Sequence, residues 1–264
     1  MNYIVLDLEF NQPFSFKTGK SYELNPECPF EIIQIGAVKL NNNFEFIEKF
    51  NYMIKPEFYK RIHPYVEKIT GITEKDLENK CYFKEAFNAF LKFIGNEDSV
   101  LCTWGIDDIK SLYRNILVHN IDTELITNKY INVQSYATKY LNYEAGKTIG
   151  LKNAVTELNI EIESKFHDAL NDADYTAKIF KIVKPNKISF DTFNIMDLIR
   201  KKSDKRIINN KALIDHFTKE LGRELTCEEE KIIKKAYKLG RNQVYDSIYI
   251  KKAKSKKKNK YPPA

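Results

Sequence analysis

Apolar residues recur with a period of two in the first part of the chain. Residues 2–6 form a short apolar run, and Glu31–Leu40 forms a second. Between Phe44 and Ile54 the aromatic and aliphatic side chains fall on one face, as they do in a half-buried strand. The three asparagines 41–43 stand between the second and third runs, where a tight turn is expected. The pattern predicts three antiparallel strands, the last two joined as a hairpin.

Strand and helix patterns alternate from about residue 65 to Pro185. The predicted strands are Ser99–Thr103 and Tyr130–Val133. The predicted helices share apolar spacings of three and four residues, and they are Tyr65–Thr70, Phe83–Ile94, Asp107–Leu117, Leu151–Leu158 and Asp168–Val183. Antiparallel strands followed by strands with helical crossovers predict an α/β domain, a mixed five-stranded sheet flanked by helices, over residues 1–185.

The pattern becomes entirely helical after Pro185. Predicted helices cover Asp191–Lys202, Asn210–Leu221 and Thr226–Leu239, with Gly222 and Gly240 expected as terminating residues. Residues 186–250 are therefore predicted to form an all-helical appendage. The lysine-rich residues 251–264 carry too few apolar side chains to pack, and we expect them to be disordered.

Composition narrows the class of protein. The four cysteines contain no C-x-x-C pair, which disfavours a zinc cluster and fits reduced thiols. The chain shows neither a secretory leader nor an apolar run of about 18 residues, so a soluble cytoplasmic protein without membrane contact is expected. From Lys187 onward there are 21 Lys+Arg against 10 Asp+Glu, net +11, which leaves net −4 for residues 1–186. This asymmetry fits a basic appendage that approaches polyanions, and fits equally a solvated lysine-rich terminus.

Two acidic residues stand at the end of the first strand. Asp7 and Glu9 are two positions apart and therefore project from the same face. The same D-x-E string occurs at 76–78 and 122–124, but there it lies outside an apolar strand. Burying two carboxylates is costly without a cation or hydrogen bonds, so Asp7 and Glu9 are candidate metal ligands.

Two later segments bring further candidates. Asp108 follows the fourth strand and a glycine turn at the start of a helix, where an Asp is also favourable through the helix dipole alone. His167 and Asp172 are five residues apart, and they converge best if His167 precedes a helix capped by Asp168. Trp104, in the glycine turn, is expected to pack in the core rather than to stack on a base.

In chain order, the D-x-E, G-x-x-D and H-x-x-x-x-D segments resemble the DEDDh-type 3′-5′ exonucleases of the ribonuclease T and proofreading-exonuclease superfamily. Residues 31–38 and 69–73 add to the similarity, which covers residues 1 to about 183. The string at 102–105 is more similar to the KapD-like and Eri-like branch than to the polymerase proofreading subunits. The resemblance implies a ribonuclease H-like fold.

The resemblance also implies chemistry: two Mg²⁺ or Mn²⁺ ions held by Asp7, Glu9, Asp108 and Asp172, with His167 as general base. The partner would be single-stranded RNA or DNA, with RNA weakly preferred. The terminal nucleotide would meet the three residues after Glu9, where many members carry Thr at the position of Asn11, and these are Phe10, Asn11 and Gln12.

Two other classes of function compete with this hypothesis. A catalytically silent module of the same fold would bind nucleic acid or protein through the basic tail, but all five active-site residue types are present. A ribonuclease H-like endonuclease would also bind metals through acidic residues, and the H-x-x-x-x-D string argues for the exonuclease. Protein partners and oligomeric state are not readable from the sequence.

Overall fold

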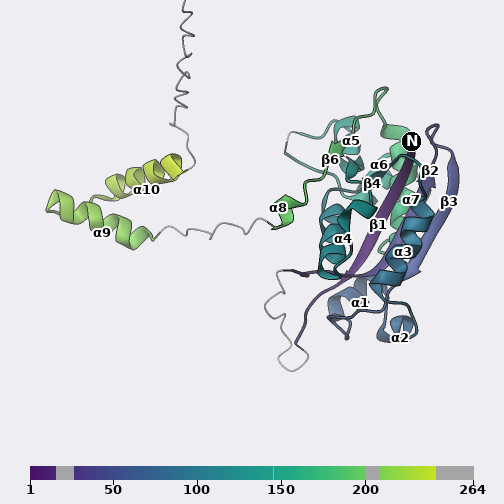
Figure 1. Ribbon diagram of the computed structural model, residues 1–264. Coiled ribbons are helices and arrows are strands. Elements are labelled where there is room, and N and C mark those ends of the chain that lie inside the picture. Colours follow the sequence, from purple (N-terminus) through teal and green to yellow (C-terminus); the bar gives the residue numbers. More distant parts are fainter. Residues whose placement is uncertain (16–26, 145, 200–208, 242–264) are drawn as a thin grey trace, which may run out of the picture. The chain divides into compact units, whose positions relative to one another are not determined.

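The computed structural model describes residues 1–15, 27–144, 146–199 and 209–241. The chain forms two compact units, Met1–Arg200 and Lys201–Ala264, and each is described by itself. The first unit carries a single mixed sheet with helices on both faces (Figure 1). The ribonuclease H-like α/β class predicted from the sequence is therefore confirmed.

The sheet has six strands in the order β3-β2-β1-β4-β5-β6. β1 pairs in antiparallel with β2 and in parallel with β4, so the sheet is mixed as predicted. The strand bounds are β1 Asn2–Asn11, β2 Glu31–Leu40, β3 Phe46–Met53, β4 Ser99–Thr103, β5 Lys129–Asn132 and β6 Asp191–Thr192.

The prediction of five strands was one strand short. A helix was expected from Asp191, but Asp191 and Thr192 pair in antiparallel with Tyr130 and Lys129 as β6. Both β6 residues are exposed, so the strand leaves no apolar period in the sequence. The described helix in this region, α8, covers Met196–Ile199.

The predicted hairpin between β2 and β3 is confirmed. The side-chain oxygen of Asn41 accepts hydrogen bonds from the backbone N–H groups of Asn43 and Glu45, both at 2.9 Å. Phe44 adopts a left-handed backbone conformation with φ 65° and stacks its ring on Tyr3 at 4.5 Å between centroids. Local asparagine chemistry therefore closes the turn, and an aromatic contact attaches it to β1.

Helices cover each face of the sheet. On one face lie α3 (Phe83–Ile94) and α4 (Asp107–Val118), and on the other lie α5 (Val133–Tyr140), α6 (Leu151–Glu157) and α7 (Ala169–Val183). Shorter helical segments lie in the connections, with α1 Pro64–Thr70 and α2 Glu74–Leu77 between β3 and α3, and a 3₁₀ turn at Thr123–Leu125 between α4 and β5.

The alternation along β1 decides which face receives its acidic residues. Ile4, Leu6 and Leu8 pack into the core beneath α3 and α4. Tyr3 and Val5 pack into the opposite core, beneath α5, α6 and α7. Asp7 and Glu9 continue the second set and so lie on the α7 side of the sheet.

The second unit contains α9 (Asn210–Leu221) and α10 (Cys227–Arg241). α9 ends as predicted at Gly222, which is left-handed with φ 67°. A capping box starts α10, because Thr226 N donates to Glu229 Oε2 at 2.8 Å and Glu229 N donates to Thr226 Oγ1 at 3.3 Å. α10 runs through Gly240 instead of ending there, and the predicted disordered tail lies outside the described residues.

Candidate active site

β1 presents its two carboxylates at the end that is crossed by α7. Glu9 is buried, with 9% of its surface exposed, and Asp7 is partly buried. In the antiparallel register Asp7 lies opposite Gly36 and Glu9 opposite Gln34. A bulge follows at Glu9 and Phe10, beyond which the strand no longer keeps this register. The two acids therefore lie on one face of β1, beside Gly36 and Gln34 of β2.

The turn between β4 and α4 brings in Asp108. The Thr103 hydroxyl donates to the carbonyl oxygen of Gly105 at 2.6 Å, and Gly105 takes φ +99°, a conformation that favours glycine. α4 begins immediately afterwards at Asp107, so Asp108 lies in its first turn. The expected placement of Asp108 at a helix start after a glycine turn is confirmed.

The start of α7 brings in His167 and Asp172. Asp168 is the N-cap, as predicted, and its Oδ1 accepts from Asn171 N at 3.2 Å. His167 precedes the helix in a left-handed conformation with φ 63°, and its backbone N–H donates to Asp172 Oδ2 at 3.1 Å. This backbone turn brings His167, which lies outside the helix, next to Asp172, which lies in its first turn.

β2 holds the N-terminus of α7 against the sheet. The Gln34 side chain, 1% exposed, accepts from Ala169 N at 3.2 Å and donates to Asp168 Oδ2 at 3.3 Å. A Cβ at Gly36 would lie 2.1 Å from the Ala169 carbonyl carbon and the Leu170 nitrogen. Only a residue without a side chain permits this approach of helix to strand. The position of Asp172 relative to Asp7 and Glu9 depends on these two contacts.

The predicted residues converge. One ligand atom each of Glu9, His167 and Asp172 lies within 4.8 Å of the other two. Burial raises the pKa of Asp7 well above its ordinary value, and the charges of Asp108, Asp172 and Glu9 raise it further. The structure therefore brings all five predicted catalytic residues into one neighbourhood.

The other three acids show the same direction of shift. Burial, followed by the charges of Asp172 and Asp108, raises the pKa of Glu9 to about 8. The pKa of Asp108 rises to about 7 through burial and the nearby carboxylates of Asp107 and Asp172. That of Asp172 rises to about 6, mainly through burial. Four buried or partly buried carboxyls lie close enough to repel one another, so a bound cation would stabilise their charged forms.

The donor set fits hard divalent cations. Asp172 Oδ1 is buried and has no hydrogen-bond partner among the described residues, although Oδ2 of the same carboxylate accepts from His167 N. An orphaned buried carboxylate oxygen is costly unless a cation compensates it. The other candidate ligands are the His167 imidazole and further carboxylate oxygens, and carboxylate oxygens suit hard divalent cations.

The structure does not support the predicted substrate contact through the Asn11 side chain. Asn11 has no exposed surface, and its amide nitrogen donates to Tyr59 O at 2.7 Å and Arg61 O at 3.0 Å. Its oxygen accepts from His63 N at 2.9 Å. The side chain therefore fastens the loop before α1 and has no group left for a nucleotide.

Phe10 and Gln12 are partly exposed, and their contact with substrate stays a prediction. Trp104 is partly buried and packs against the core beneath α5, α6 and α7, as the preferred interpretation of the sequence had it. Sequence reasoning missed two residues that shape the site, Gln34 and Lys165. Gln34 stood out only as part of the family-like string at 31–38, and no sequence signal marked Lys165.

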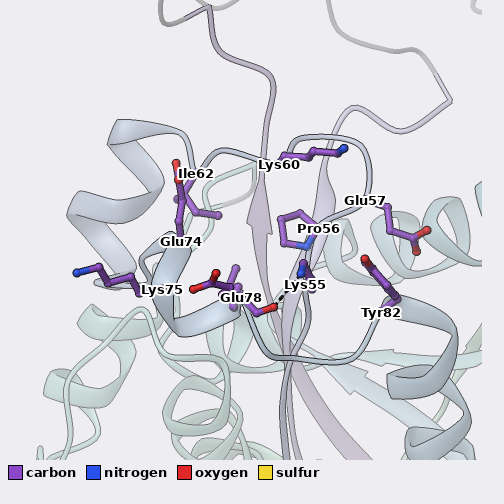
Figure 2. A pocket seen from close by; sticks show the side chains of 10 residues that line it. Lys55, Pro56, Glu57, Lys60, Ile62, Glu74, Lys75, Glu78 and Tyr82 are labelled. Carbon is purple, nitrogen blue, oxygen red and sulfur yellow. Dashed lines mark hydrogen bonds between the residues drawn. The ribbon is translucent and has the colours of Figure 1, made fainter.

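A separate pocket of about 640 Å³ lies between the loop before α1 and α2 (Figure 2). Its described lining includes three lysines and three glutamates, and one of these, Lys55, already donates to Glu78 O at 2.8 Å. None of the five candidate catalytic residues is among those lining residues. The acidic site therefore does not coincide with this pocket.

An open mixed sheet with carboxylates from β1, α4 and α7 meeting on one face is the arrangement of a ribonuclease H-like nuclease, a phosphodiester hydrolase. The chain belongs to the exonuclease family of ribonuclease T, whose sequence profile matches residues 4–180. Its motifs resemble those of the DEDDh 3′-5′ exonucleases, and it shares its fold with a solved member of that group.

The chain is similar to several known proteins. It is 26% identical over 186 residues to a probable 3′-5′ exonuclease KapD of Bacillus subtilis, covering 70% of this chain and 85% of that protein. It is 32% identical over 180 residues to a PolC-type DNA polymerase III of Thermotoga maritima, covering 67% of this chain and 11% of the polymerase. Among solved structures, the nuclease domain of 3′hExo, a DEDDh family member bound to rAMP, has a TM-score of 0.57 and 19% identity, with 67% of this chain and 88% of that chain covered.

The described residues contain no helix of the length and apolar character that a membrane span requires.

Proposed function

We propose that this protein removes nucleotides one at a time from the 3′ end of single-stranded nucleic acid, with RNA weakly preferred, and that Asp7, Glu9, Asp108, Asp172 and His167 perform the reaction. The observation that supports it most directly is the convergence of Glu9, His167 and Asp172 within 4.8 Å beside two further acids. Each of these residues comes from an element whose position is set by buried contacts.

The four carboxylates would hold two Mg²⁺ or Mn²⁺ ions. The orphaned Oδ1 of Asp172 and the raised pKa values of Glu9 and Asp108 support this assignment. Bound divalent cations lower the pKa of water and stabilise the charge that develops on a phosphoryl group. Burial of the carboxylates on the α7 side of β1 keeps the charges close to that group.

His167 would take the proton from the attacking water. Its side chain is exposed, whereas its backbone N–H is held by Asp172, so the imidazole reaches solvent from a fixed backbone. Asp172 thus has two roles that do not compete: Oδ2 fixes the backbone of His167, and Oδ1 faces the cation site. General-base catalysis of this kind contributes roughly 10²–10⁴-fold to rate.

The preference between RNA and DNA rests on the resemblance at residues 102–105 and on the relationship with KapD. Proteins of this fold have been solved with both kinds of ligand, since 3′hExo was bound to rAMP and Exonuclease I to a dA16 oligonucleotide. Base contacts would come from apolar or aromatic side chains near the site, for which partly exposed Phe10 is the candidate.

Digestion of 5′-labelled single-stranded RNA and DNA of equal sequence tests the proposal. With Mg²⁺ or Mn²⁺ we expect a ladder that shortens from the 3′ end, faster on RNA, and none with EDTA. Glu9→Gln and Asp7→Asn should reduce the rate at least 10²-fold. Glu78→Gln is the matched control, because Glu78 is the second acid of an exposed D-x-E string and its loss should leave the rate unchanged.

The outcome separates the competing classes. Internal fragments of a circular or 3′-blocked strand would indicate an endonuclease instead. Absence of cleavage in either metal, with strand binding retained in Glu9→Gln, would indicate the catalytically silent module.

A further inference from the structure

Residues 164–167, the segment that carries His167, each contact α7. Ser164 exchanges two hydrogen bonds of 2.8 Å with the Tyr175 hydroxyl, through its N–H and its carbonyl oxygen. The Phe166 ring stacks on Tyr175 at 4.9 Å between centroids. The carbonyl of Lys165 accepts from Asn171 Nδ2 at 3.0 Å. These contacts fix the segment to its own helix, and they do not relate it to the opposite side of the site.

One side chain of the segment makes that second connection. Lys165 Nζ donates to the carbonyl oxygen of Thr70, the last residue of α1, at 3.1 Å. Thr70 is buried, and its hydroxyl donates to Val66 O at 2.9 Å and accepts from Ile72 N at 3.0 Å, so this carbonyl belongs to a rigid turn. A carbonyl at a helix C-terminus is a good acceptor for a cation.

The α1 end of this bond is itself anchored to the sheet. Val66 and Ile72, on either side of Thr70, pack with Ile33 of β2 in a small apolar cluster. Gly71, which follows Thr70, takes a left-handed conformation with φ 76° that favours glycine. The Lys165 ammonium also lies close enough to Glu9 to lower the pKa of that carboxyl, against the larger effect of burial.

We propose that Lys165 is a positioning residue for catalysis: through its bond to Thr70 it holds His167 at a set distance from α1 and from Glu9. This inference rests on the proposed role of His167 as general base. The other hydrogen bonds of residues 164–167 are made with α7, so without Lys165 these residues stay attached to their helix but lose their hydrogen bond to α1. The Lys165 ammonium donates one hydrogen bond to the Thr70 carbonyl, and this bond is the observation that assigns the positioning role.

The test uses the full chain with Mn²⁺ and a 5′-labelled single strand. The variants are Lys165→Met, Lys165→Arg, His167→Ala and the double variant His167→Ala with Lys165→Met. Lys68→Met is the matched control, because it removes an exposed lysine two residues before Thr70. The measured quantities are kcat, KM and the thermal unfolding midpoint of each variant.

We expect Lys165→Met to lower kcat about 10-fold with KM within two-fold of the wild type, in line with loss of an interaction needed in the transition state. Lys165→Arg restores at least half of kcat, because arginine keeps the charge and the donors. In the His167→Ala background, Lys165→Met lowers the remaining rate by less than two-fold, since residues that act through one another are not additive.

Four results would overturn the inference. An unchanged kcat and KM in Lys165→Met would show that Lys165 does not position His167. A raised KM with unchanged kcat would show that Lys165 contacts the nucleic acid instead. Full additivity with His167→Ala, or a loss that follows a lower unfolding midpoint and is not rescued by arginine, makes it a structural residue. If the wild-type chain releases no nucleotides, the proposed function and this inference fail together, whereas an active wild type with a normal Lys165→Met overturns only the inference.

Discussion

At the scale of single residues, the active-site acids are held in a repulsive arrangement. Burial and mutual charge raise the pKa of Asp7, Glu9, Asp108 and Asp172 together. In the unfolded chain these carboxyls lose their protons near pH 4. In the metal-free folded protein three of them keep protons until about pH 6, 7 and 8.

This difference has a definite sign for stability. Between about pH 4 and pH 8 the folded protein binds more protons than the unfolded chain, so its free energy of unfolding falls as pH rises. We expect the unfolding midpoint of the metal-free protein to drop by several degrees between pH 5.5 and pH 8. Mn²⁺ should raise the midpoint more at pH 8 than at pH 5.5, because it neutralises charges that exist only at the higher pH.

Thermal unfolding in EDTA and in Mn²⁺ at the two pH values checks this. Glu9→Gln should raise the metal-free midpoint at pH 8 by a few degrees, at roughly 2–4 °C per kcal/mol for a domain of this size. Glu78→Gln should change neither the unfolding midpoint nor its dependence on pH. A Glu9→Gln variant that is less stable than the wild type in EDTA at pH 8 would contradict the repulsive arrangement.

At the scale of elements, the site depends on how closely α7 lies on β2. Gln34 bonds to the cap and first residue of the helix, and Gly36 leaves no space between the two backbones. Because Gly36 lies opposite Asp7 in the sheet, any shift of α7 moves Asp172 relative to β1.

Gly36→Ala should therefore disturb stability and activity together. The added Cβ would meet backbone atoms at 2.1 Å, and backbone cannot move aside like a flexible side chain. We expect a loss of about 1–3 kcal/mol in stability. The rate should fall roughly 10²-fold in the fraction that stays folded, since a displacement of about 1 Å costs that much.

Single-turnover rates and unfolding midpoints measure both effects. Gly150→Ala is the control, because a Cβ at Gly150 meets nothing within 4 Å, and this variant should match the wild type. A Gly36→Ala variant with normal activity would show that α7 can move without displacing Asp172.

At the scale of the whole molecule, the question is where the catalytic domain ends. The sequence placed its end at residue 185, and we propose that the independently folding domain extends to about residue 200. Phe193 is 6% exposed, stacks on Tyr113 at 5.0 Å, and donates from its backbone N–H to Asn128 O at 2.8 Å. Ile195 and Leu198 pack against the same core.

Truncation tests the boundary. A chain ending at residue 200 should unfold near the midpoint of the full protein's first unit and keep its exonuclease rate on short strands. A chain ending at 185 loses β6 and Phe193, and deleting a buried phenylalanine side chain alone costs about 3–5 kcal/mol. Equal unfolding midpoints for the two truncated chains would show that the catalytic domain ends at residue 185.

Five of the six strands and most of the longer helices followed from local patterns, whereas α5 was not predicted. β1, α3 and α7 have regular apolar spacing, Asp168 has the chemistry of an N-cap, and Gly222 that of a helix end. β6 has none of these features, because two exposed residues become a strand only through pairing with β5. Gly240 was expected to end a helix that continues through it.

The sequence alone determined which residues are acidic, which strand or helix carries each, and the family to which the chain belongs, because these depend on neighbours a few positions away. Only the tertiary structure decided that Asn11 fastens a loop, that Gln34 holds α7, and that Lys165 reaches Thr70. The partners of Gln34 and Lys165 are 134 and 95 residues distant along the chain. A hydrogen bond between such residues exists only after the sheet and helices have packed, so no local pattern records it.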